Sequence, residues 1–132
     1  MNKIASDSKD NIYVADTYNN RIEKFDSSGK FITKWGVKGT GDRQFDSPGS
    51  VTADIEDNIY VADTGNNRIQ KFDSSGKFIA KFGIKGANIG EFISPSDMSS
   101  DYDGNLYVAD TGNNRIQKFD SSVTFISKWG EF

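Results

Sequence analysis

An aspartate and an arginine recur five residues apart at three places in this 132-residue chain. A carboxylate beside a guanidinium can bind an anion, orient a substrate or form an ion pair. Catalysis needs different residues in different roles, whereas this arrangement is the same each time. We therefore predict a structural role, in which the two side chains pair or bond the backbone of a tight turn. The pairs are Asp16 and Arg21, Asp63 and Arg68, and Asp110 and Arg115.

A second recurring acid occupies positions 7, 54 and 101. A ring of carboxylates from Asp7, Asp54 and Asp101 can hold a cation in a central channel, but an aspartate at a strand end more often caps a turn, which is the role we expect. The segment 101–105 is similar to the start of a calcium loop. Its twelfth position is Gly112 instead of an acid, which excludes an EF-hand. We predict no cofactor, with the channel cation as the alternative.

The residue types that are missing narrow the function further. The chain has no histidine and no cysteine, so the commonest general base and the thiolate metal ligands are absent. A net charge of −3 argues against binding to a phosphate backbone. No run of 18 apolar residues and no apolar leader is visible, so we expect neither a membrane span nor a signal peptide, and the compartment stays open.

The recurrence reflects a sequence repeat of 47 residues. Asn11, Asn58 and Asn105 open the same phrase, and residues 60–75 and 107–122 are identical. Residues 13–28 differ from them only at Tyr18 and Glu23. Such similarity indicates recent amplification, assembly from a repeat consensus, or a fragment of a longer repeat protein.

Each repeat contains four short β-prone runs, which in the middle copy are residues 50–53, 58–62, 68–72 and 78–82. No helical period separates them, so an antiparallel meander is predicted. A four-stranded sheet that is apolar on both faces must stack on copies of itself, which predicts an all-β fold of β-propeller type. Lysine recurs in the fourth run, as expected for an exposed edge strand. These residues are Lys34, Lys81 and Lys128.

The phrase at residues 58–73, followed by Phe82-Gly83, Gly90-Glu91-Phe92 and Ser94-Pro95, closely resembles the NHL repeat. The resemblance covers all three copies. It implies a six-bladed propeller that binds proteins, RNA or small ligands, with a few lyases and hydrolases among the relatives. Lysine at positions 24, 71 and 118 departs from the family, which usually has an apolar residue there.

Three blades cannot close a ring, and six is the only multiple of three among the usual four to eight. We therefore predict one domain, 1–132, that forms a head-to-tail homodimer. Its blades are 1–36, 45–83 and 92–130, its linkers are 37–44 and 84–91, and the chain break between Phe132 and Met1 falls in a linker. We expect Lys3 of one chain near Asp97 of the other. The alternative is a fragment of a longer propeller.

The residues that break the repeat are candidates for a binding site. Loops carry function more often than strands do, and Tyr18, Lys38, Arg43 and Lys85 all belong to loops on one predicted face. They can contact a ligand or an acidic protein, or they can reflect drift on a tolerant surface.

We predict a non-catalytic scaffold or binding module whose partners are itself and a protein or small ligand. The alternatives are a carboxylate- or metal-dependent lyase or hydrolase, and an RNA-binding propeller that would need a basic face with stacking aromatic residues.

Overall fold

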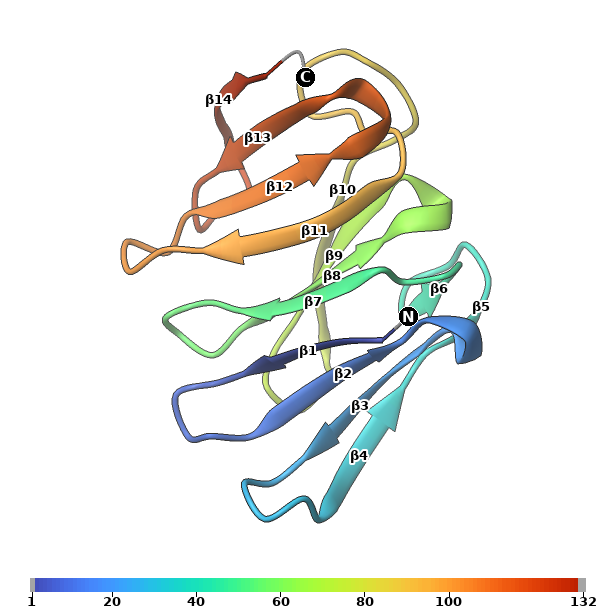
Figure 1. Cartoon of the computed structure of the whole chain (residues 1–132), viewed down its shortest axis with the longest axis vertical. Helices are drawn as coiled ribbons and strands as arrows, with labels where there is room; N and C mark the ends of the chain where they lie inside the picture. The colour runs from blue at the N-terminus through green and yellow to red at the C-terminus, as the bar shows by residue number, and fades with distance from the viewer. Residues whose placement is uncertain (1, 131–132) are drawn as a thin grey trace.

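The computed structural model describes residues 2–130, which form three four-stranded antiparallel sheets side by side (Figure 1). In each sheet the strands follow chain order from the inner to the outer edge, which confirms the predicted meander and the all-β fold. The first blade comprises β1 (Lys3–Ser6), β2 (Ile12–Asp16), β3 (Arg21–Phe25) and β4 (Phe31–Trp35). The second comprises β7 (Ser50–Ala53), β8 (Ile59–Asp63), β9 (Arg68–Phe72) and β10 (Phe78–Phe82). The third comprises β11 (Pro95–Ser100), β12 (Leu106–Asp110), β13 (Arg115–Phe119) and β14 (Phe125–Trp129).

The second strand of the middle blade lies one residue later than predicted. Asn58 belongs to the preceding turn, because its backbone N–H donates to the Asp54 carboxylate. At the other end Asp63 pairs with Arg68 in the ladder and extends the strand. The junction between Phe132 and Met1 lies outside the described residues.

A single turn of 3-10 helix joins the second and third strands of every blade: η1 (Thr17–Asn19), η2 (Thr64–Asn66) and η3 (Thr111–Asn113). Each turn ends on an asparagine with positive φ, and asparagine tolerates this left-handed conformation better than most residues. The φ angles of Asn20, Asn67 and Asn114 are 54°, 55° and 54°. The repeated turn sequence therefore sets the same hairpin three times.

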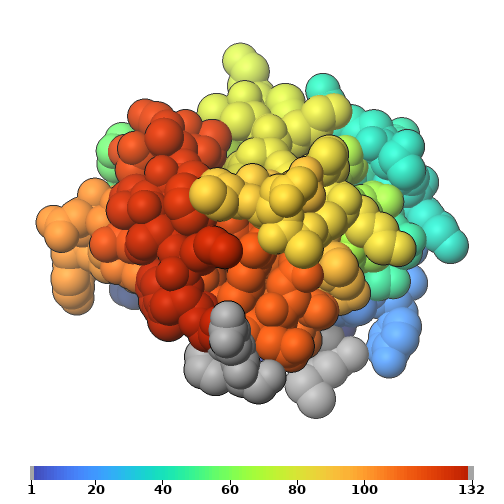
Figure 2. All heavy atoms as spheres, turned by 90° about the horizontal axis from the view of Figure 1, so that it is seen from above, coloured from blue at the N-terminus to red at the C-terminus, as the bar shows by residue number. Residues whose placement is uncertain are grey.

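The two linkers return along the turn-bearing ends of the blades. In the first, β5 (Val37–Lys38) and β6 (Gln44–Phe45) form a short parallel pair, and in the second Lys85 bridges to Phe92 in the same way. Figure 2 shows the second linker, in yellow, lying against the orange and red third blade. Each linker thus covers the blade that follows it.

The core consists of two layers, one between each pair of neighbouring blades. Successive side chains of a strand point to opposite faces, so blade 2 contributes alternate residues to both layers. Ile59 and Val61 face blade 1, whereas Tyr60 and Ala62 face blade 3. This explains why residues 59–62 of β8 are all apolar and why the whole strand is buried. No helix in residues 2–130 is long and apolar enough to cross a membrane.

Candidate functional site

The Asp–Arg pair of blade 2 is a buried clamp on the linker. The Nε atom of Arg68 donates to Asp63 at 2.7 Å, and the two side chains are 9% and 0% exposed. The other guanidinium nitrogens donate to three carbonyl oxygens of the linker, those of Thr40, Gly41 and Gln44, at 2.8–3.0 Å. Each of the three guanidinium nitrogens therefore donates to a structural acceptor.

Three further hydrogen bonds complete the clamp. The second oxygen of Asp63 accepts from the backbone N–H of Asp46 at 2.8 Å. Gln70 donates to the carbonyl of Gln44 at 2.7 Å and accepts from the N–H of Arg43 at 3.0 Å. The carboxylate, guanidinium and amide thus fix the linker backbone.

Blade 3 repeats this clamp around Arg115, which donates to Asp110 at 2.7 Å and to the carbonyls of Ala87, Asn88 and Glu91 at 2.8–2.9 Å. Two copies with the same bonds support the structural role predicted for the Asp–Arg pairs, because all three nitrogens of each guanidinium donate to the carboxylate or to linker carbonyls.

In blade 1 the pair holds no linker within residues 2–130. Arg21 donates to Asp16 at 3.1 Å, and its terminal nitrogen lies 3.3 Å from the carboxylate of Glu23. Its side chain is 32% exposed, in contrast to 9% for Arg68. Glu23 replaces the glutamine of the other blades, which must donate to a linker carbonyl. In residues 2–130 no linker carbonyl accepts from Arg21. A glutamate at position 23 can pair with this guanidinium instead.

Tyr18 has a similar explanation. The glycines that replace it in the other blades lie directly beneath the linker: a Cβ atom on Gly65 would lie 2.5 Å from the side chain of Asp46, and one on Gly112 would lie 2.3 Å from Ile93. Tyr18 has no described linker above it and is 85% exposed. Neither the drift nor the ligand interpretation anticipated this steric cause.

Three of the four proposed binding residues do come together. Tyr18, Lys38 and Arg43 line an open hollow of about 650 Å³ that Arg21 and Lys34 share. Lys85 belongs to the equivalent hollow of the next blade, beside Arg68 and Lys81, so it does not join the other three. Arg43 also donates to the carbonyl of Gly76 at 3.1 Å, which ties it to blade 2.

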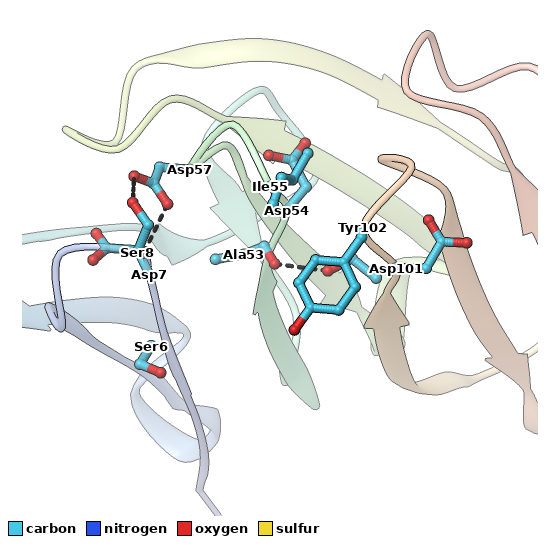
Figure 3. A pocket seen from close by; sticks show the side chains of 10 residues that line it. Ser6, Asp7, Ser8, Ala53, Asp54, Ile55, Asp57, Asp101 and Tyr102 are labelled. Carbon is cyan, nitrogen blue, oxygen red and sulfur yellow. Dashed lines mark hydrogen bonds between the residues drawn. The ribbon is translucent and has the colours of Figure 1, made fainter.

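The opposite end of the molecule carries a hollow of about 480 Å³ where the first turns of the blades converge (Figure 3). Asp7, Asp54 and Asp101 line it, but each carboxylate belongs to its own turn. In Asp54, for example, one oxygen accepts from the backbone N–H groups of Glu56 and Asn58 at 2.9 and 3.0 Å. Among residues 2–130, no three acidic side chains are arranged to hold a metal ion. In residues 2–130 these carboxylates therefore act as turn caps.

Hydrogen bonds lower the pKa of Asp101 and of Asp7. The backbone N–H of Asn105 is the main cause that lowers the pKa of Asp101 to about 2. Burial opposes it as the second-largest effect, and the bonds from the Asn105 amide and the Tyr107 hydroxyl lower the pKa further. For Asp7, burial raises the pKa, but the bonds from Asn11, Lys9 and Tyr13 together outweigh it and the pKa is lowered.

Acid should therefore destabilise the fold below about pH 4. The pKa of Asp101 is lower in the folded chain than its ordinary value of 3.8, so the unfolded chain takes up this proton at a higher pH. The stabilisation that the Asp101 carboxylate gives the fold is therefore complete above 3.8 and is lost as the pH falls towards about 2. In Asp101→Asn, where the amide oxygen still accepts from the turn, urea unfolding at pH 2–6 should show a shallower decline than in the wild type. An equally steep decline would contradict this assignment.

Lys3 and Asp97 approach each other within a single chain, and the predicted contact between two chains stays a prediction. The structure places them in one chain, with Lys3 Nζ 4.0 Å from Asp97 Oδ2 and both side chains about half exposed. Ser50 also donates to Asp97, at 3.1 Å. The inner strands of blades 1 and 3 both lie beside β7, which brings these charges together without a second copy.

The sequence did not reveal that the clamps act on linker carbonyls. The available signal was that Tyr18 and Glu23 change together in blade 1, before which residues 2–130 contain no linker, whereas the rest of the phrase is unchanged. Two substitutions that occur together in this way indicate a shared missing neighbour.

Comparison with solved structures agrees with the fold. A streptogramin B lyase matches with a TM-score of 0.77 and 17% identity, over 97% of this chain and 39% of that one. Hydrazine synthase of Kuenenia stuttgartiensis matches with 0.77 and 14%, over 98% and 35%. Virginiamycin B lyase from Staphylococcus aureus matches with 0.75 and 20%, over 97% and 40%. At these identities the likeness shows the fold alone, and this chain spans 35–40% of their lengths.

Curated protein sequences include no match to this chain. A family model described as 6-bladed beta-propeller matches residues 3–73 and again residues 49–129, so the two matches cover almost the whole chain. The three stacked meanders are blades of this architecture. The chain therefore belongs to the 6-bladed beta-propeller family.

Proposed function

We propose that this chain is a non-catalytic propeller scaffold built of NHL-type repeats, and that a second copy completes its ring of six blades. The observation that carries the proposal is the exposure of two apolar blade faces whose counterparts are buried inside the chain. Family membership supplies the number of blades, and the chain contributes three of them.

The outward face of blade 3 repeats a face that blade 1 buries. Tyr13, Ala15 and Ile22 are fully buried against blade 2, whereas their counterparts Tyr107, Ala109 and Ile116 are partly exposed. The contrast is greatest at the outer strand, where Trp35 is 4% exposed and Trp129 is 46% exposed. An aromatic side chain of this size gains most from burial.

The outward face of blade 1 shows the same relation. Ile4 is 69% exposed, while its counterparts Val51 and Met98 are 4% and 9% exposed because a preceding blade covers them. The outward faces of blades 1 and 3 therefore carry the two halves of one blade interface. A second copy offers both halves at once and closes a two-fold symmetric ring.

The polar constellations support a scaffold more than an enzyme. The clamps in blades 2 and 3 bind linker backbone, and the aspartates at the other end cap turns. The hollow lined by Tyr18, Lys38 and Arg43 is the place where we propose that an acidic protein or small ligand binds. The lyase names belong to distant structures, and no residue set among residues 2–130 favours that activity.

Light scattering after size-exclusion chromatography tests ring closure. The chain has a mass of 14.6 kDa, so we expect a particle of about 29 kDa, twice that mass, at micromolar concentration. A particle of 14.6 kDa at all micromolar concentrations would overturn the proposal.

A charge on the outward face provides the matched test. Ile4→Glu should shift the particle to the single-chain mass, because the glutamate would be buried without a partner in the ring. Ile79→Glu is the control. Ile79 is 48% exposed and its counterparts Ile32 and Ile126 are 47% and 46% exposed, so a neighbouring blade does not cover this position. The control should leave the mass unchanged.

A further inference from the structure

We infer that Trp129 of one copy packs over Gly29 of a second copy, and that the sizes of this pair fix how the two copies join. The inference rests on the proposed ring closure and names the contact that specifies it. It starts from an alternation of residue sizes at the outer edge of the two interfaces inside the chain.

At the interface between blades 1 and 2, a large residue meets a small one. Trp35 ends β4, and the turn of blade 2 that faces it contains Gly76. A Cβ atom on Gly76 would lie 2.6 Å from the Cε3 atom of Trp35. Only a glycine therefore leaves room for the indole, which also lies 5.5 Å from the ring of Phe72.

At the interface between blades 2 and 3, both sizes change in a compensating way. Phe82 takes the place of Trp35, and Val123 takes the place of Gly76, and both pack against the same apolar core. Val123 has a φ angle of 59°, which is unfavourable for a β-branched residue. A strained valine at this position is consistent with a need to fill the space that the smaller phenylalanine leaves.

The two ends of the chain continue this alternation. Trp129 stands at the position of Trp35, and Gly29 stands at the position of Gly76. A Cβ atom on Gly29 would meet no atom within 4 Å, so the surface above it is open. A large residue on blade 3 and an open glycine on blade 1 are the two members of a Trp–Gly pair.

A polar contact agrees with the same register. The ammonium of Lys24 donates to the carbonyl of Ser74 in the next blade at 2.7 Å, and that of Lys71 donates to Ser121 at 3.0 Å. Lys118 is the third of this set, and its Nζ atom lies 5.4 Å above the Tyr107 ring, the geometry that Lys24 and Lys71 adopt over their tyrosines. Continuing the repeat assigns its acceptor as the carbonyl of Ser27 of the second copy.

Swapping the sizes tests the pair. Gly29→Val should raise the dissociation constant of the dimer at least about fivefold, because overpacking of this kind costs about 1–3 kcal/mol and 1.4 kcal/mol is tenfold. Trp129→Phe alone should also weaken association, since it leaves a void. The double variant recreates the Phe82–Val123 combination. Its dissociation constant should therefore rise by less than the product of the two single-variant increases. Sedimentation equilibrium measures all four constants.

The backbone strain of Gly29→Val does not confuse the result, because it is present in both the free and the joined chain. Circular dichroism checks that each variant folds, and Gly29→Ala repeats the test with a smaller side chain if valine prevents folding. A second readout uses Trp35→Phe, which leaves Trp129 as the single tryptophan. Its emission should shift to shorter wavelength as the dimer forms.

The outcomes separate the two proposals. A wild type that stays a single chain overturns ring closure, and the contact with it. A wild-type dimer in which Gly29→Val has no effect, or in which the two substitutions act independently, overturns the Trp129–Gly29 contact and leaves ring closure intact. Unchanged emission of Trp129 on dimer formation also overturns the contact.

Discussion

Replacing Asp63 by alanine should lower the free energy of unfolding by about 3–5 kcal/mol, because it leaves a buried guanidinium without its carboxylate. Arg68 is 9% exposed and cannot turn to water while its other nitrogens hold the carbonyls of Thr40, Gly41 and Gln44. The backbone N–H of Asp46 would lose its acceptor as well. Urea unfolding at a fixed protein concentration measures the loss.

Blade 1 supplies the matched control. Asp16→Ala removes the same residue from the same turn, but Arg21 is 32% exposed and keeps the carboxylate of Glu23 at 3.3 Å. Its loss should be about 1 kcal/mol, the value of a partly exposed pair. Equal losses in the two variants would show that the linker bonds contribute nothing.

Proteolysis gives an independent readout of the same clamp. The linker contains Lys38 and Arg43, two trypsin sites, and cleavage needs the backbone to leave its fixed path. Asp63→Ala should speed cleavage at Arg43, because the clamp around Arg68 holds the backbone on either side of it. Asp16→Ala should not change the rate, since Asp16 makes no described bond to this linker.

The strands were predictable because the signal is local and occurs three times. The ranges 50–53, 68–72 and 78–82 agree with the structure residue for residue. The turn residues between the strands determined the strand ends. A wrong strand assignment in one copy of the repeat would have disagreed with the other two copies. The second strand begins one residue later than predicted because the backbone N–H of Asn58 donates to the Asp54 side chain. Strand propensity gives no information about this side-chain bond.

The environment of each copy was not predictable, because it depends on neighbours distant in the chain. Tyr60 and Tyr107 occupy the same position of the repeat, but Tyr60 is buried and Tyr107 is partly exposed. Within the described residues only blade 2 has a blade on both sides. The contact between Lys3 and Asp97 has the same origin, because it needs the curvature of three blades around one axis. Sequence repetition predicts the blade, whereas stacking determines what each face meets.

Replacing Phe92 by alanine should lower the free energy of unfolding by about 3–5 kcal/mol, the usual cost of deleting a buried phenylalanine ring. The ring is fully buried at the end of the second linker and lies 6.1 Å from Phe82 and 5.9 Å from Phe119. Gly83 closes the site, since a Cβ atom there would lie 2.5 Å from the ring of Phe92. The surrounding aromatic residues come from two blades and cannot all collapse into the cavity.

The same linker provides the control in Ile89, which is 58% exposed. Ile89→Ala should change the free energy of unfolding by less than about 0.5 kcal/mol, as surface substitutions usually do. A small effect of Phe92→Ala would mean that the linker is held by the Arg115 clamp alone. The large effect that we expect would show that each linker needs two attachments, a polar clamp on its backbone and an aromatic ring inserted between the blades it joins.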